Sequence, residues 1–337
     1  MEVAIVGASG YAGAELLRIC ATHDTFKLTH AAAQNYAGTL IKDLYPHLGY
    51  FYGDKKFSDS NIENLDGLDI VFLALPHGAS QNIVPSLSGK VGKIIDLSAD
   101  FRLKDPQVYK QWYGQDHSCI DFLPKFTYGL PELNRQSIKK ADLVAVAGCY
   151  PTAAVLSLNP LVKENLIEPK GIIVDAASGI SGAGRSLTHS SHFSTANEDF
   201  SAYNLLHHRH TPEMEQAIGS QVLFTPHLAP MTRGILATCY AKPQKSTSTE
   251  QLIEVLTNYY KDDPFVIVDK KLPSTKAVSG SNFAHITARF DPRTGWIVVI
   301  CAIDNLVKGA AGQAIQCANL ACGINEQSGL LVAGPYP

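Results

Sequence analysis

The cysteine at position 149 stands where an apolar run ends and a helical pattern begins. Residues 144–147 are small or β-branched, Gly148 ends the run, and Pro151 and Thr152 open the helical pattern. Open α/β sheets bind ligands at the carboxyl ends of their strands, and a helix N-terminus lowers a thiol pKa from about 8.5 toward neutrality. Cys149 is therefore a candidate nucleophile. The alternative is a buried cysteine that acts as a small hydrophobic residue.

A group of histidines could supply the acid or base that a nucleophilic thiol needs. His207, His208, Arg209 and His210 stand directly before a Thr-Pro-Glu sequence, which is typical of a helix start. An imidazole near its ordinary pKa of about 6.5 can exchange protons at neutral pH, and an arginine between histidines suits an anionic substrate. No paired cysteine or suitably placed third ligand supports a metal site here, so we expect no metal. A solvated loop with incidental histidines is the alternative.

A glycine-rich turn near the N-terminus fits a dinucleotide. The stretch VGASGYAG lies between an apolar run and a helical pattern. Glycine lets the backbone approach a pyrophosphate, whose charge the free N–H groups of a helix start then meet. A tight turn that binds no ligand would have the same glycines. The predicted cofactor contacts in this half are Gly7, Ser9, Gly10, Tyr11, Ala12, Gly13 and, at the end of the third apolar run, Pro76.

The end of the second apolar run bears on the choice of cofactor. NAD-binding versions of this turn usually place an acidic residue about 20 residues after the glycines, where it holds the ribose 2′-hydroxyl. Gln34 and Asn35 occupy that place here. Because no carboxylate would repel a 2′-phosphate, the sequence favours NADP(H), although no arginine is there to bind that phosphate.

A second glycine-rich turn, ASGISGAGRS, spans residues 177–186. Its small residues, among them Ser181 and Gly182, could bring backbone amides to the cofactor, and Arg185 could pair with an anionic substrate. Without other context, the same stretch could be a flexible surface loop.

The apolar runs predict an α/β protein. Five short runs alternate with helical stretches, which predicts a parallel sheet with helices on both faces; they span 2–7, 27–33, 69–76, 93–98 and 142–148. Six further runs with fewer helices between them predict a mixed or antiparallel sheet; they span 171–178, 221–226, 234–241, 265–269, 283–290 and 295–303. We therefore expect a Rossmann-type dinucleotide-binding domain and a second, α+β domain.

Composition excludes several classes of partner. At 337 residues with 45% hydrophobic and 18% charged residues, the chain is long enough for two buried cores. A net charge of −3 gives no basic footprint for nucleic acid. No apolar run reaches the ~20 residues that cross a bilayer, and the N-terminus lacks the charged leader of a signal peptide. Seven cysteines without a C-x-x-C pair indicate a reducing, cytoplasmic location.

The chain resembles the N-acetyl-γ-glutamyl-phosphate reductases of arginine biosynthesis over nearly its full length. The stretches that carry the resemblance occur in the family's order; they include GASGYAGAELLR, FLALPHG, DLSADFRL, YGLPELNR, GCYPTAA, SGISGAGR, AYNLLHHRHTPE, FTPHLAPMTRGILAT and IDNLVKGAAGQA. The resemblance implies the semialdehyde dehydrogenase type of fold. It also implies NADP-binding parts at 1–148 and 305–337, because the last helix returns to the first domain, and a catalytic and oligomerisation domain at 149–304.

The resemblance also implies roles for individual residues. Cys149 matches the family's nucleophile, which forms a thioester that NADPH reduces, with release of phosphate. His208 matches its acid/base residue and His210 a neighbouring polar contact. Arg102 of SADFR would bind the substrate phosphate, with Arg185 and Arg209 as further candidates, and Asn305 would hold the nicotinamide amide. A homo-oligomer, dimer or tetramer, is expected.

Three rival functions share part of this pattern. Aspartate-semialdehyde dehydrogenase and the carrier-protein-linked aminoadipyl or glutamyl phosphate reductases use the same thiolate and hydride chemistry. A non-catalytic NADP sensor would keep the fold but would not need both Cys149 and His208. GCYPTAA and HRHTPE favour the N-acetylglutamyl version.

Overall fold

The protein folds into two compact units. The computed structural model describes residues 1–336. Within these residues, one unit comprises 1–147 and 310–331, and the other comprises 148–309 and 332–336. Residues 305–309 thus belong to the second unit. Two hydrogen bonds hold the start of this segment there: Asp304 accepts one from Gly280 N–H, and Asn305 accepts one from Gly234 N–H. The division expected from the family, with the boundary at 305, stays a prediction.

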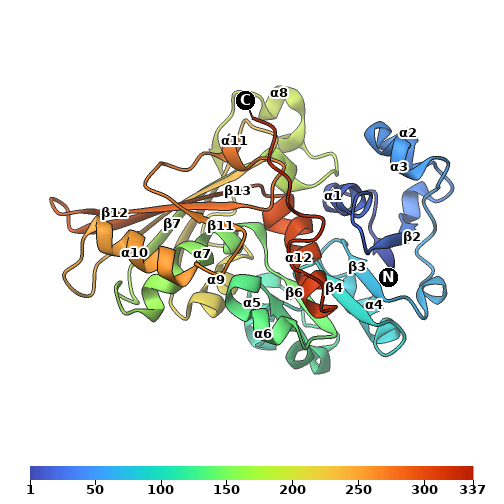
Figure 1. The fold of residues 1–337 in the computed structure, drawn as a ribbon, viewed down its shortest axis with the longest axis horizontal. Helices are drawn as coiled ribbons and strands as arrows, with labels where there is room; N and C mark the ends of the chain where they lie inside the picture. The colour runs from blue at the N-terminus through green and yellow to red at the C-terminus, as the bar shows by residue number, and fades with distance from the viewer. Residues whose placement is uncertain (337) are drawn as a thin grey trace. The chain divides into compact units, whose positions relative to one another are not determined.

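The first unit contains a six-stranded sheet in the order β2-β1-β3-β4-β6-β5 (Figure 1). All of its strand pairs are parallel. The strands are β1 Glu2–Val6, β2 Lys27–Ala32, β3 Ile70–Leu73, β4 Lys93–Asp96, β5 Thr127–Gly129 and β6 Leu143–Val146. Each of the five predicted runs contains one strand. Strand β5 was not predicted, because three residues are too few to form an apolar pattern.

Helices flank this sheet. They are α1 Tyr11–Cys20, α2 Ile41–Leu44, α3 Gly49–Tyr52, α4 Ser80–Leu87, α5 Pro106–Tyr113, α6 Pro131–Ile138 and α12 Gly312–Ala321. The predicted C-terminal helix begins as a π-helix at Val307–Ala311, in which Gly309 N–H donates to the carbonyl of Asp304, five residues back. From Gly312 it continues as α12, whose ten residues are all buried and which packs against α1, α6 and β4.

The second unit contains a seven-stranded mixed sheet in the order β11-β12-β13-β10-β7-β9-β8. Two pairs, β7 with β9 and β11 with β12, are parallel and the others are antiparallel. The strands are β7 Ile172–Gly179, β8 Ser201–Ala202, β9 Val222–Ala229, β10 Ile235–Ala241, β11 Val266–Val268, β12 Ala284–Asp291 and β13 Trp296–Ile303. The prediction was a mixed or antiparallel sheet, and the sheet is mixed. The two-residue strand β8 was missed.

Three helices cover one face of the second sheet (Figure 1). They are α7 Cys149–Lys163, α9 Thr211–Ile218 and α10 Thr249–Tyr259, while α8 Phe193–Ala196 and α11 Thr275–Val278 are single turns. Side chains alternate along the strands, so Ala237 and Cys239 of β10 are buried under the helices while Leu236 and Tyr240 of the opposite face stay partly exposed. Among the helices of residues 1–336, none is long and apolar enough to cross a membrane.

Candidate active site

Cys149 is the first residue of helix α7, at the carboxyl end of strand β6. Its predecessor Gly148 is extended, with φ −69° and ψ 160°, and no side chain caps the helix start. The thiol is partly exposed. The N-terminus of a 15-residue helix carries a partial positive charge, which stabilises negative charge on the sulfur. The position predicted for a nucleophile is therefore present.

Two residues distant in the sequence hold the start of α7. Oε1 of Glu213, on α9, accepts a 2.7 Å hydrogen bond from Gly148 N–H, and Glu213 has no exposed surface. Gly309 packs against the nucleophile, because a Cβ built there would lie 2.7 Å from Cys149 Cβ. Sequence reasoning missed both contacts. The only signal for Glu213 was its place in the Thr-Pro-Glu helix start.

His208 lies among aromatic rings from three parts of the second unit. Its ring is 5.5 Å from that of Tyr150 on α7, 5.4 Å from Tyr203 and 5.2 Å from Phe224 on β9, each edge-on. Burial, followed by the charge of Arg209, lowers the pKa of His208 to about 4. The expectation of an imidazole near its ordinary pKa is therefore wrong for His208, because the aromatic rings exclude the water that would solvate its charged form.

The same aromatic residues lie near the cysteine. Burial raises the pKa of both Tyr150 and Tyr203, and the charge of a Cys149 thiolate raises both further. The Tyr203 hydroxyl donates to that of Tyr150 at 3.2 Å, and Tyr150 donates to the carbonyl of His227 at 3.0 Å. Cys149 and His208 thus share these two tyrosines as neighbours.

The other predicted residues of the histidine loop differ in exposure. The His210 ring is 4.9 Å from that of His208, and the residue is partly buried. His207 and Arg209 are exposed. The lower accessibility of His208 and His210 separates them from His207.

Asn305 joins two loops of the second unit. It is 2% exposed, its Oδ1 accepts from Gly234 N–H at 2.7 Å, and its Nδ2 donates to Ser181 Oγ at 2.9 Å. Ser181 is buried in the turn after β7, whereas Gly182 is exposed and Arg185 partly so. Both ends of the Asn305 amide already have protein partners, so its contact with a nicotinamide stays a prediction.

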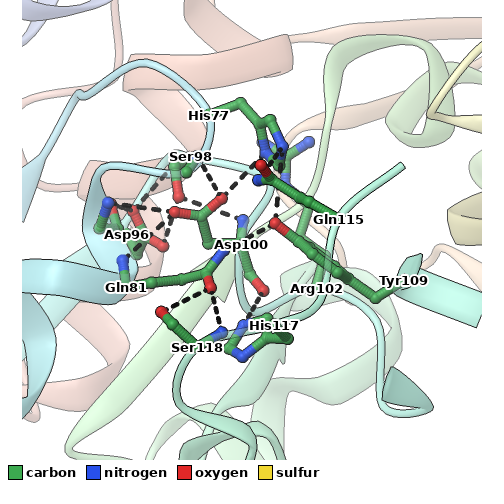
Figure 2. A network of polar contacts seen from close by, with 12 residues as sticks. His77, Gln81, Asp96, Ser98, Asp100, Arg102, Tyr109, Gln115, His117 and Ser118 are labelled. Atoms are coloured by element: carbon green, nitrogen blue, oxygen red, sulfur yellow. Dashed lines mark hydrogen bonds and ion pairs between the residues drawn. The ribbon is translucent and has the colours of Figure 1, made fainter. Parts of the chain in front are cut away.

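Arg102 belongs to a polar network in the first unit (Figure 2). The residue is 7% exposed, and one guanidinium nitrogen donates to the carbonyl of Leu97 at 2.7 Å. Nearby, Asp100 has no exposed surface and its carboxylate lies 2.9 Å from His77 Nδ1. Loops after β3 and β4 supply these residues, at the sheet edge where ligands of such folds bind. The network beyond Arg102 was not predicted.

Asp100 also closes the N-terminus of helix α4. Its carboxylate accepts hydrogen bonds from the backbone N–H groups of Gly78 at 2.7 Å, Ser80 at 3.0 Å and Gln81 at 3.3 Å. The residue at the N-cap itself, Ala79, has no side chain that could do so. The loop after β4 therefore fixes the loop that contains His77.

The glycine turn has the shape that a dinucleotide requires. Gly7 has φ +88°, and a Cβ there would lie 2.3 Å from the carbonyl oxygen of Ala74. A Cβ on Gly13 would lie 2.3 Å from Gly7 O, and the N-cap Gly10 has no side chain to bond the first N–H groups of α1. A backbone cradle without side chains at a helix start fits a pyrophosphate. Ser9 lies in the same turn, and Tyr11 and Ala12 are the first two residues of α1.

The residues expected near the ribose lie beyond β2. Gln34 and Asn35 are exposed in a single 3₁₀ turn, and Gln34 Oε1 accepts a hydrogen bond from Ser60 N–H at 3.2 Å. Pro76 is exposed after β3. In the part of the chain that the structure describes, no cluster of three or more His, Cys, Asp or Glu side chains could hold a metal ion.

The structure brings the predicted residues together in two groups. Cys149, His208, His210, Ser181 and Asn305 belong to the second unit, with Gly182, Arg185 and Arg209 in the same unit. The glycine turn, Gln34, Asn35, Pro76 and Arg102 belong to the first.

Comparisons with known proteins agree with this architecture. Residues 2–141 match the family model "Semialdehyde dehydrogenase, NAD binding domain", and residues 149–305 match "Semialdehyde dehydrogenase, dimerisation domain". The N-acetyl-gamma-glutamyl-phosphate reductase of Pelotomaculum thermopropionicum is 48% identical and that of Desulforudis audaxviator 45%, with 100% of this chain and at least 99% of each relative covered.

A solved structure shows the same fold. Aspartate semialdehyde dehydrogenase II of Vibrio cholerae superposes with a TM-score of 0.70 over 96% of this chain and 98% of that one, at 17% sequence identity. The expected fold class, a Rossmann-type domain with an α+β domain of the semialdehyde dehydrogenase type, is confirmed. The chain belongs to the semialdehyde dehydrogenase family and, within it, to the N-acetyl-γ-glutamyl-phosphate reductases.

Proposed function

We propose that this enzyme reduces N-acetyl-γ-glutamyl phosphate to N-acetylglutamate 5-semialdehyde with NADPH and releases phosphate, as a step of arginine biosynthesis. The observation that carries the proposal is the placement of Cys149 at the start of α7, beside the aromatic residues that surround His208, in a chain whose relatives bear this name. The rival that acts on aspartate semialdehyde shares the fold, but at 17% identity that likeness concerns the fold alone.

The mechanism begins with the thiolate of Cys149, which attacks the acyl carbon of the substrate. A carbon–sulfur bond forms, the carbon–oxygen bond to phosphate breaks, and a thioester remains on the enzyme. NADPH, when bound, would supply the hydride for the acyl carbon; the carbon–sulfur bond then breaks, which releases the semialdehyde and restores the Cys149 thiolate. The thioester keeps the acyl group bound to the enzyme in a form that accepts a hydride, as a carboxylate would not. Glu213 and Gly309 hold the sulfur in place for attack.

Cofactor and substrate contacts divide between the two groups of residues. The glycine turn would hold the pyrophosphate, and Arg102 would bind the phosphate leaving group, since its planar fork matches phosphate oxygens. The absence of a carboxylate at Gln34 and Asn35 supports NADPH over NADH. His210, Arg185 and Arg209 are the remaining candidates for substrate contact.

The uncovered face of the second sheet supports an oligomer. Leu236 and Tyr240 on β10, with Val298 and Ile300 on β13, are apolar and partly exposed there, and this part of the chain matches a dimerisation domain. A second copy of the chain would cover this face, in a dimer or a tetramer, and light scattering would give its mass. The free thiols of all seven cysteines suit a reducing cytoplasm.

The decisive assay runs the reaction in reverse, which avoids the unstable acyl phosphate. Phosphate-dependent reduction of NADP is measured with N-acetylglutamate 5-semialdehyde and, in parallel, with aspartate semialdehyde. We expect turnover with the first substrate, and loss of nearly all of it in Cys149→Ser. Cys119→Ser, a partly exposed thiol of the first unit, is the matched control. Preference for aspartate semialdehyde, or an active Cys149→Ser enzyme, would refute the proposal.

A further inference from the structure

Asp304 carries a buried carboxylate directly after strand β13, and the residue has no exposed surface. Its Oδ2 accepts a hydrogen bond from Gly280 N–H at 2.6 Å and lies 3.5 Å from Nη1 of Arg233. Its Oδ1 accepts hydrogen bonds from the N–H groups of Leu306 at 2.8 Å and Val307 at 3.2 Å. A buried charge is costly unless it is paired and hydrogen-bonded. This carboxylate therefore fixes the segments from which its partners come.

The turn between β9 and β10 holds Asp304 and its neighbour together. Arg233 pairs with Asp304, and the next residue of the turn, Gly234, donates its N–H to Asn305 at 2.7 Å. The turn is bound in its own right to the end of β7, because Gly179 N–H donates to the carbonyl of Gly234 at 2.9 Å. Asp304 is therefore anchored to the sheet of the second unit.

The helical turn that begins beyond Asp304 has an unusual register. Residues Val307–Ala311 form a π-helix, in which Gly309 N–H donates to the carbonyl of Asp304 at 2.9 Å. In an α-helix that carbonyl would accept from Lys308, four residues on, instead of five. A π-turn thus contains one residue more than an α-turn, and such turns are frequent at functional sites.

This register places a glycine against the nucleophile. A Cβ built on Gly309 would lie 2.7 Å from Cys149 Cβ and 3.4 Å from the carbonyl oxygen of Asp304. In the α-helical register Lys308 would take this place, and its side chain would need the space that Cys149 fills. In the π-turn Lys308 is instead buried elsewhere, with its Nζ 5.9 Å from the centre of the Phe265 ring.

We propose that Asp304 is a positioning residue for Cys149: its buried carboxylate holds the π-turn in the register that places Gly309 against the nucleophile. The residue acts through Gly309. Without the carboxylate, the N–H groups of Leu306 and Val307 lose their acceptor, and the turn can relax to the α-helical register. The inference rests on the proposed function in one respect, that Cys149 is the nucleophile.

A first experiment measures the Cys149 thiol without substrate or cofactor. The rate constant for its alkylation by iodoacetamide is followed by mass spectrometry of the Cys149 peptide, under conditions in which urea denaturation shows each variant to be folded. We expect a lower rate constant in Asp304→Ala, because the side chain of Lys308 then crowds the thiol. Asp304→Asn keeps one oxygen as an acceptor for the turn, so its rate constant should lie between those of Asp304→Ala and wild type.

The matched control is Asp291→Ala, at the other end of β13. It removes a carboxylate that also accepts a backbone hydrogen bond, from Arg293 N–H at 3.0 Å. Its alkylation rate constant should equal that of wild type. A folded Asp304→Ala enzyme with the wild-type rate constant would overturn the inference. If Asp304→Ala does not fold, Asp304→Asn serves the same test, and an unchanged rate constant in that variant is the contradicting result.

A second experiment asks whether Asp304 acts through Gly309. In the reverse assay, Asp304→Ala should lower kcat/KM between about 10-fold and 10²-fold, the cost of a misplaced reacting group. Adding Gly309→Ala should lower it little further, because residue 309 no longer faces Cys149 in the relaxed turn. Losses that multiply, as for independent sites, would overturn the inference. Wild-type enzyme inactive on N-acetylglutamate 5-semialdehyde would refute the proposed function, while the alkylation rates would still test the role of Asp304.

Discussion

Replacing Gly309 by alanine should displace Cys149 without changing its thiol group. The added methyl would lie 2.7 Å from Cys149 Cβ and 3.2 Å from its Cα, while ordinary contacts begin at 3.4 Å. The start of α7 must therefore move by about 0.7 Å or more, since neither atom is the end of a flexible side chain. A misplacement of about 1 Å can cost roughly 10²-fold in rate. We expect kcat/KM to fall between about 10-fold and 10²-fold, with a loss of unfolding free energy of ~1–3 kcal/mol from overpacking.

The assay is phosphate-dependent reduction of NADP by the semialdehyde, with denaturation in urea measured on the same samples. Binding of NADPH, followed by its fluorescence, should be unchanged. Gly49→Ala is the control, because its methyl would meet only the side chain of Lys42. A folded Gly309→Ala enzyme with wild-type kcat/KM would show that the glycine does not position Cys149.

Three further changes test other parts of the structure. Glu213→Ala leaves the buried N–H of Gly148 without its 2.7 Å acceptor, so the unfolding free energy in urea should fall by at least ~1–3 kcal/mol; an unchanged value would refute that contact. Burial raises the pKa of Asp96 to about 6 from 3.8. The folded state therefore holds this proton more tightly than the unfolded state does. As pH rises from 4 to 6, the unfolding free energy should fall by up to about 3 kcal/mol. Asp96→Asn should remove this pH dependence from the urea transitions; a variant that keeps it would exclude Asp96 as the source. Gln34→Asp should shift the ratio of kcat/KM values toward NADH through repulsion of the 2′-phosphate, and an unaltered ratio would show that Gln34 is not near it.

The features that could be predicted from the sequence are those that short motifs determine. The apolar runs located nearly all strands of both sheets, and the change from apolar run to helix at Cys149 placed that residue at a helix start. The glycines of the first turn predicted a backbone cradle, which Gly7 and Gly13 form by leaving no room for a Cβ. In each case the determining residues are close together in the chain.

Properties that depend on distant residues could not be predicted. The low pKa of His208 arises from rings at positions 150, 203 and 224, which no local pattern connects. The contact of Gly309 with Cys149 joins positions 160 residues apart, and nothing in the sequence KGAAG indicates a glycine required for its neighbour in space. Strands β5 and β8 were missed because their hydrogen bonds, not their own residues, define them.

The capping of α4 by Asp100 has a consequence for the order in which the first unit folds. The carboxylate that closes this helix comes from a residue beyond β4, about 20 positions after the helix start. An isolated segment containing β3 and α4 lacks that acceptor, and short helices are marginal in water without such support. We therefore expect α4 to become stable only after β4 has joined the sheet. In hydrogen-exchange pulse labelling during refolding, the amides of Ser80 and Gln81 should acquire protection together with those of β4, and not before them.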